Sequence, residues 1–149
     1  MSHEYISPIL RKASVRCFNV PGAQETLAVH GHLSNAVFVP AGAGVVHVTG
    51  QVGNLESGEV PSDCQNEYRQ AFENVQTVLR AAGIEEGWEA VYKVHFLSTD
   101  LSSERLQEWL KNIQTYCKDS RPTQMAVGVT AIGWPGATLE IYVEAVKIV

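Results

Sequence analysis

The chain has 149 residues, of which 45% are hydrophobic, and a formal net charge of −5 at pH 7. These values fit one globular domain, and they disfavour binding to nucleic acid or to a membrane surface because no basic run offsets the acidic balance. The apolar runs are too short to span a bilayer and the N-terminus lacks the build of a signal peptide, so we expect a cytoplasmic protein.

The N-terminal third is weakly patterned. Residues 1–22 are interrupted by proline and glycine, and we interpret them as an extension that pairs at a sheet edge through Val15–Phe18. Short strands are predicted at Thr26–His30 and Ala36–Pro40, and a stronger strand at Val45–Gly50.

The clearest signal is an amphipathic helix from Ser62 to Gly83. Its hydrophobic residues recur at helical spacing along one stripe: Ala71, Phe72, Val75, Val78, Leu79 and Ala82. Ser62 followed by Gln65 resembles a capping box, and Gly83 is a typical residue just past a helix end. The pattern predicts one helix with one buried face.

The second half alternates strands with one more helix. Residues 90–98, 124–130 and 138–149 show strand alternation, and residues 103–117 repeat the helical stripe. The predicted order is β-β-β-α-β-α-β-β, with no further helix. This order favours the α+β class, a mixed sheet with both helices on one face.

The other face of that sheet has no predicted cover. By strand alternation it carries Val45, His47, Thr49, Lys93, His95, Leu97, Gln124, Ala126, Glu140, Tyr142 and Glu144. Large half-apolar faces are rarely left in contact with water, so we expect other copies of the same chain to cover this one. The count of layers therefore predicts an oligomer.

A set of short motifs occurs in order along residues 31–149. They are Val45–Gln51, Gly58–Pro61, Ala81–Gly83, Val91–Val94, Arg121-Pro122, Val127–Val129 and Glu144–Val146. Together they resemble the Rid family of reactive intermediate deaminases, also called YjgF-like proteins. The resemblance implies a chorismate-mutase-like fold over residues 31–149, with residues 1–30 as an N-terminal extension that carries the edge strand. It also implies a homotrimer with small-molecule clefts between subunits, and neither a metal nor an organic cofactor.

The resemblance also implies a chemistry. Deaminases of this family hydrolyse 2-imino or enamine acids to 2-keto acids and ammonia. The arginine that binds the substrate carboxylate corresponds to Gln124 here, and a tyrosine of the site corresponds to Leu33. Because an amide lacks the charge of a guanidinium, we expect the usual activity to be weak or absent and the substrate to be non-standard.

Two further parts of the site follow from the same alignment. Thr49 and the Gly50 amide retain a donor for a substrate oxygen. The glutamate that orders the attacking water corresponds to Tyr142, or to Glu140 or Glu144 if the insertion at 133–136 shifts the alignment. The alignment leaves these three alternatives open.

The candidate site residues divide by role. We assign Glu144, Tyr142 and His95 to catalysis, and Gln124, Thr49, Gly50, Leu33, Lys93 and Trp134 to substrate binding. His95 lies two residues from Lys93 on one strand face, either as a general base or as an interface histidine with satisfied nitrogens. The five histidines show no paired spacing for a metal, and the three cysteines fit free thiols.

Two hypotheses remain. The first is an enzyme that acts on a reactive small imine, enamine or carbonyl metabolite in a cleft between subunits. The alternative is a non-catalytic trimeric protein that binds a small molecule. The absence of a basic patch disfavours a third possibility, RNA cleavage.

Overall fold

The computed structural model describes residues 6–149; residues 1–5 of the predicted extension lie outside the described residues. The helices are α1 (Pro8–Lys12), α2 (Ala23–Gly31), α3 (Cys64–Ala81) and α4 (Ser103–Cys117), with a 3-10 turn η1 (Gly87–Ala90). The strands are β1 (Arg16–Phe18), β2 (Ala36–Phe38), β3 (Gly44–Gln51), β4 (Val91–Ser98), β5 (Thr123–Gly128) and β6 (Leu139–Lys147).

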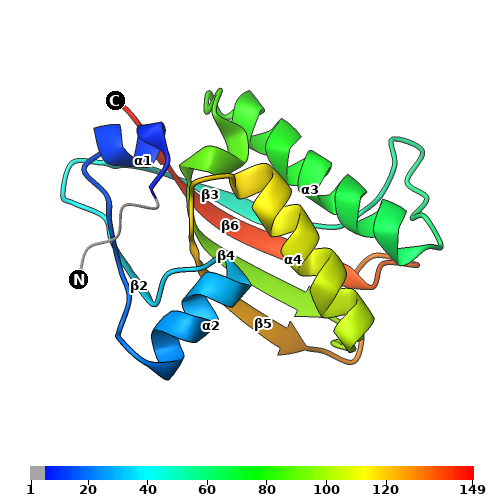
Figure 1. Cartoon of the computed structure of the whole chain (residues 1–149). Helices are drawn as coiled ribbons and strands as arrows, with labels where there is room; N and C mark the ends of the chain where they lie inside the picture. The colour runs from blue at the N-terminus through cyan, green and yellow to red at the C-terminus, as the bar shows by residue number, and fades with distance from the viewer. Residues whose placement is uncertain (1–5) are drawn as a thin grey trace.

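Four strands form the main sheet, in the order β3-β6-β4-β5. Strand β6 is antiparallel to both β3 and β4, whereas β5 is parallel to β4 because α4 carries the chain back between them. Helices α3 and α4 lie side by side on one face of this sheet (Figure 1). The α+β class, the mixed sheet and the placement of both long helices are therefore confirmed.

Aromatic side chains fill the space between these helices and the sheet. The Phe72 ring stacks on Trp88 at a centroid distance of 4.6 Å, and Phe96 stacks on Trp109 at 4.1 Å. The indole of Trp88 donates a 2.9 Å hydrogen bond to the Phe72 carbonyl, so its polar atom is satisfied inside the core. All four residues are buried, so their rings add a large apolar area to the core.

The opposite face of the sheet is open. No element among residues 6–149 packs over it: Val45 is 39% exposed and the side chain of His47 is 63% exposed. The prediction of a face that this chain does not cover is confirmed.

The N-terminal region differs from the prediction. Residues 26–30, predicted as a strand, belong to the helix α2, and α1 was not predicted at all. Two apolar residues of α2, Leu27 and Val29, are exposed, so the segment lacks the one-sided stripe by which a helix is recognised. Its end is fixed locally, since His32 adopts a left-handed conformation and the Leu33 amide donates to the Ala28 carbonyl.

The predicted edge strand lies elsewhere than in the main sheet. Strand β1 pairs with β2 in a separate two-stranded sheet. Residues ahead of α2 nevertheless enter the central core: Ile6, Leu10, Val15 and Cys17 are buried in the same cluster as the α3 residues. The division of the chain at residue 30 stays a prediction.

The start of α3 also differs slightly. The helix begins at Cys64, and Asp63 is its N-cap, accepting a 3.0 Å hydrogen bond from the Asn66 amide. The predicted capping box at Ser62 and Gln65 is therefore displaced by one residue. Gly83 follows the helix with a φ of 84°, as expected for a residue just past a helix end.

Candidate functional site

The predicted site residues occupy three separate places in the structure. Glu144, Tyr142, Lys93 and His95 lie on the open face of the sheet, Gly50 and Trp134 lie beside Glu140, and Leu33 and Gln124 line a hollow on the helix side. Each place has its own geometry and chemistry.

The first place is the Glu144 cluster, which we define as Glu144, Tyr142, Tyr92, Lys93 and His47. The two tyrosine hydroxyls each donate a 2.9 Å hydrogen bond to one of the two oxygens of the Glu144 carboxylate. The Lys93 ammonium and His47 Nδ1 lie 3.4 Å from Glu144 Oε1. The carboxylate is thus saturated by groups from β3, β4 and its own strand.

These contacts set the protonation of the cluster. Burial by itself raises the pKa of Glu144, but the hydroxyls of Tyr92 and Tyr142 and the charge of Lys93 outweigh it and hold that pKa below its ordinary value. Burial, and then the hydrogen bond to the carboxylate, raise the pKa of Tyr92 and Tyr142. Glu144 is therefore an anion at neutral pH with its lone pairs already engaged, a state that suits a structural ion better than a proton acceptor.

Tyr92 was missed as a member of this cluster. Because Lys93 and His95 are predicted on the open face, strand alternation predicts Tyr92 on the covered one with Val94, yet the Tyr92 hydroxyl reaches Glu144 on the open face. The cause is an irregularity in the ladder, since Val91 pairs with Ala145 whereas Lys93 pairs with Glu144. His95 borders the cluster, with its ring 5.7 Å from that of Tyr142.

The second place is the Glu140 pocket, a hollow of about 380 Å³ lined by Gly50, Gln51, Val52, Asn54, Gly133, Trp134 and Glu140. A methyl group added at Gly50 would collide with the Glu140 carboxylate, so that carboxylate lies directly over the Gly50 backbone. Two contacts fix the walls. Trp134 Nε1 donates to the Gly58 carbonyl at 3.0 Å, and Asn74 Nδ2 donates to the Asn54 carbonyl at 2.9 Å.

This geometry bears on the three alternatives for the water-ordering carboxylate. Of Glu140, Tyr142 and Glu144, it is Glu140 that lies beside Gly50. Thr49 is exposed next to Gly50, at the point where the β3–β6 ladder is interrupted between Val48 and Gln51. Of the three alternatives, Glu140 is therefore the one that lies next to the Gly50 backbone at the end of β3.

The third place contains Gln124, which the sequence had assigned to the open face together with Ala126. That assignment is wrong, because Gln124 is in register with the buried Val94 and Ala126 with Phe96. The Gln124 Oε1 accepts a 2.9 Å hydrogen bond from Trp109 Nε1. Its Nε2 donates to the carbonyls of Gly31 and His32, at 3.0 and 3.1 Å.

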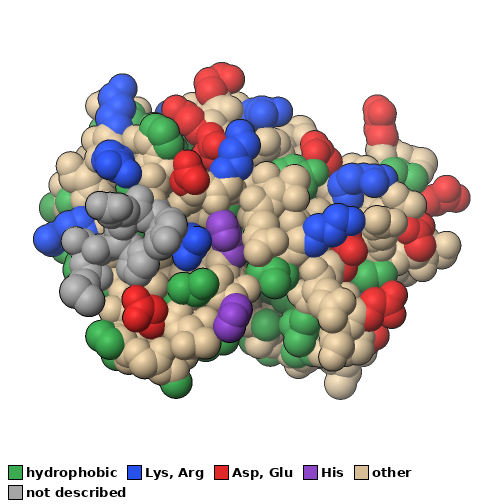
Figure 2. Space-filling view, viewed as in Figure 1, with side chains coloured by type: hydrophobic (Ala, Val, Ile, Leu, Met, Phe, Trp, Pro, Cys, Tyr) green, Lys and Arg blue, Asp and Glu red, His purple; other side chains and the backbone are tan. Residues whose placement is uncertain are grey.

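Gln124 is on the wall of a large hollow between α2, α4 and β5, which we call the apolar pocket. Its volume is about 510 Å³, and it is lined by Leu27, His30, Gly31, Leu33, Phe96, Leu106, Trp109, Leu110, Gln124, Met125 and Ala126. Figure 2 shows hydrophobic side chains gathered in the depression between α2 and α4. The pocket is of a size that fits a small organic molecule.

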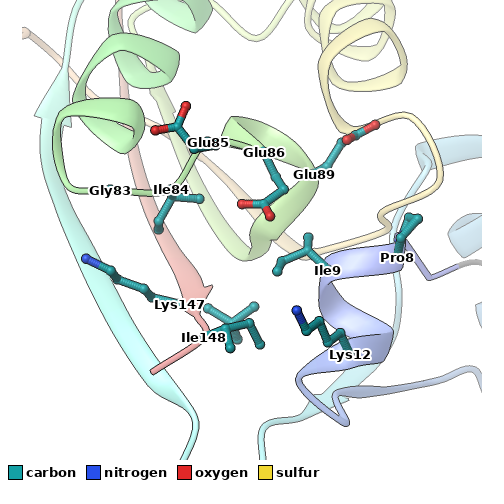
Figure 3. Close-up of a pocket in the computed structure, with 11 residues that line it drawn as sticks. Pro8, Ile9, Lys12, Gly83, Ile84, Glu85, Glu86, Glu89, Lys147 and Ile148 are labelled. Carbon is teal, nitrogen blue, oxygen red and sulfur yellow. The ribbon is translucent and has the colours of Figure 1, made fainter.

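A further hollow contains none of the predicted site residues. It measures about 360 Å³ and lies where α1 meets the end of α3 and the end of β6 (Figure 3). Ile9, Ile84 and Ile148 line it together with lysine and glutamate side chains. The Lys147 ammonium donates a 2.9 Å hydrogen bond to the Ala82 carbonyl, and so it caps the C-terminus of α3.

Residues 6–149 contain no group of three or more His, Cys, Asp or Glu side chains placed to hold a metal ion. None of the helices in this range combines the length and the hydropathy that spanning a membrane requires. The three cysteines are unpaired, and burial raises the pKa of the Cys17 thiol and of the Cys117 thiol.

Comparisons with known proteins agree on one family. The family model described as Endoribonuclease L-PSP matches residues 24–147. A RutC family protein from Aquifex aeolicus strain VF5 is 31% identical over 107 residues, covering 70% of this chain and 82% of that protein.

Solved structures share the fold. The Rid-family protein YyfB from Yersinia pestis superimposes with a TM-score of 0.78 at 24% identity, covering 89% of this chain and 98% of the other. TdcF from Escherichia coli, solved with bound serine, gives a TM-score of 0.62 at 26% identity, covering 80% and 94%.

The fold and its hollows define an α+β protein of the chorismate-mutase-like type. With the family model matching most of its length, this chain belongs to the Rid (YjgF-like) family, as the sequence motifs predicted.

Proposed function

We propose that the chain forms a homotrimer and that its site is completed where the Glu140 pocket of one copy meets the apolar pocket of the next. The observation that supports this proposal is the distance between the two groups of predicted substrate-binding residues. Gly50 is on β3 and Gln124 is on β5, the two outer strands of the sheet. Because β3 and β5 are three strand spacings of about 4.8 Å apart, the two residues are separated by roughly 14 Å. The Glu140 pocket beside Gly50 lies on the open side of the sheet, whereas Gln124 lies on the helix side.

One small molecule therefore cannot touch both groups within a single chain. A second copy brings one group opposite the other when it covers the open face with the side that carries its own apolar pocket, and the half-exposed Val45 on the open face supports such a contact. We take the number of copies, three, from what the family resemblance implies. The Glu144 cluster, whose polar groups satisfy one another, suits the interior of this interface.

The reaction that we assign to this site is the hydrolysis of a reactive imine, enamine or related carbonyl derivative. The Glu140 carboxylate accepts a proton from water as the water oxygen bonds to the carbon of the C=N group. Glu140 passes this proton to the nitrogen, which gives a carbinolamine. Glu140 then takes the proton of the carbinolamine hydroxyl and delivers it to the same nitrogen; as the C=O bond forms, the C–N bond breaks, and a carbonyl compound and ammonia are released. The Thr49 hydroxyl and the Gly50 amide donate hydrogen bonds to the substrate beside that carboxylate.

The test combines assembly with turnover. Sedimentation velocity is expected to give a trimer, and imines generated in situ from apolar primary amines by an amine oxidase are expected to disappear faster when the protein is present. Glu140→Gln removes the proton acceptor and is expected to lower that acceleration by about 10²- to 10⁴-fold. Glu85→Gln, on an exposed loop remote from both pockets, is the matched control and is expected to retain full activity.

A monomer in sedimentation would remove the shared site. A trimer that binds small ketones but hydrolyses no imine would replace the enzyme with the alternative, a non-catalytic binding protein. Unchanged turnover in Glu140→Gln would contradict the role of that carboxylate.

A further inference from the structure

The walls of the apolar pocket indicate which chemical groups of a substrate can bind there, which the sequence position of Gln124 alone does not. We propose, on the basis of the function above, that the pocket takes an uncharged apolar group of the substrate and excludes a free carboxylate. The substrate class is then the imines and enamines derived from apolar aldehydes and ketones, including the esters and amides of 2-oxo acids.

The first argument is the hydrogen bonding of Gln124. Both N–H hydrogens of its amide are used, one on the Gly31 carbonyl and one on the His32 carbonyl. Its oxygen accepts from the Trp109 indole. A ligand therefore meets no donor from this side chain, and its remaining capacity is one acceptor lone pair, which repels an anion. Gln124 is a positioning residue that anchors the end of α2.

The second argument is the composition of the walls. No Lys, Arg, Asp or Glu lines the apolar pocket within residues 6–149, and His30, exposed to solvent, is its one titratable side chain in that range. A carboxylate entering this hollow would lose its water and find no charged partner. An alkyl or aryl group would instead exchange water for leucine, methionine and tryptophan surface, which favours binding in proportion to the area covered.

A matched pair of ligands tests the proposal on the full-length protein. The probes are 4-methyl-2-oxopentanoate and its methyl ester, which share a carbon skeleton and differ in the charge of one group. Titrations followed by NMR are expected to show the ester binding at least about tenfold tighter than the anion. Ala126→Leu fills the pocket and is expected to weaken ester binding by a similar factor. Ala41→Leu, on an exposed turn, is expected to leave it unchanged.

The outcomes separate this inference from the proposed function. If the anion binds as tightly as the ester, the exclusion of carboxylates is overturned, while trimer formation and the loss of turnover in Glu140→Gln still stand. If neither probe binds, or if Ala126→Leu binds the ester as well as the unmodified protein does, the pocket is not where the apolar group lies. A monomer in sedimentation contradicts the function, whichever probe binds.

Discussion

The two faces of the central sheet differ in how their side chains are stabilised. On the covered face, apolar side chains of β4 and β6 pack against α3 and α4, and residues such as Phe72 and Trp88 are fully buried within one chain. On the open face, alternate residues of the same strands are polar or half-exposed, and the charged groups bond to one another around Glu144. One face is covered within the monomer, whereas the other is left open by residues 6–149 and is the face on which we propose that another copy docks.

This difference predicts which substitutions alter the stability of one chain and which alter the proposed assembly. The covered face derives its energy from apolar area and tolerates little change of volume. The open face holds its charges in a fixed arrangement within one chain, which would lower the cost of burying them in the proposed interface. Substitutions on the two faces should therefore affect different measurements.

The largest effect is expected on the covered face. Phe72→Ala removes a ring stacked on Trp88, and we expect the free energy of unfolding to fall by about 3 to 5 kcal/mol, measured by urea titration. Phe38→Ala is the matched control, because that ring is 45% exposed and its loss should cost far less. Equal losses in the two variants would erase the distinction between a packed layer and the surface.

A smaller effect is expected for assembly when the open face is charged. Val45→Asp places a carboxylate on the face that we propose is covered by another copy, and the dissociation constant of the trimer should rise at least about tenfold, or ~1.4 kcal/mol. Leu55→Asp is the control, since Leu55 is 40% exposed, much as Val45 is, but lies in a loop. Sedimentation equilibrium distinguishes them. Intact trimers in both variants would contradict an interface on this face.

The smallest effect concerns the Glu144 cluster. Glu144→Gln weakens the hydrogen bonds from Tyr92 and Tyr142, and we expect a loss of about 1 kcal/mol in the free energy of unfolding at pH 7. Glu85→Gln, on an exposed loop, should leave stability unchanged. A variant as stable as the unmodified protein would mean that the cluster contributes nothing to folding.

The same variant sharpens the comparison through pH. Because the folded pKa of Glu144 is lowered, the folded chain binds fewer protons than the unfolded chain as the pH falls below the unfolded value of about 4.3. Its stabilisation is complete above that value and is lost as the pH passes through the folded pKa. Urea titrations at pH 7 and below pH 4 should therefore show a smaller acid-induced loss of stability in Glu144→Gln than in the unmodified protein.

The long elements of the fold could be predicted because their cause is local. Helix α4 spans Ser103–Cys117, as its apolar stripe predicted, and α3 differs only near its first residue. Helix α2 could not be predicted in this way, because it is held by tertiary contacts such as those from Gln124 to its last carbonyls. Propensity and periodicity are weak wherever packing decides the conformation.

The site was less predictable than the fold, for a related reason. Alternation along a strand shows which residues share a face, but the face itself is set by the neighbouring strand. The prediction that Gln124 lies on the open face was therefore wrong, because its register with Val94 places it on the covered face. The irregularity that turns Tyr92 toward Glu144 has no signature in the sequence. Glu140 was among three alternatives, and only its closeness to Gly50 distinguishes it.

The order of the strands has a consequence for how the protein is made. Strand β6 is the last strand in the sequence, yet it lies between β3 and β4 in the main sheet. Until residues 139–147 have left the ribosome, β3 has no partner in that sheet. The apolar residues that pack against β6 then remain exposed. Such late, long-range pairing makes folding slow and exposes the nascent chain to aggregation. The main sheet can therefore be completed only after residues 139–147 have been synthesised.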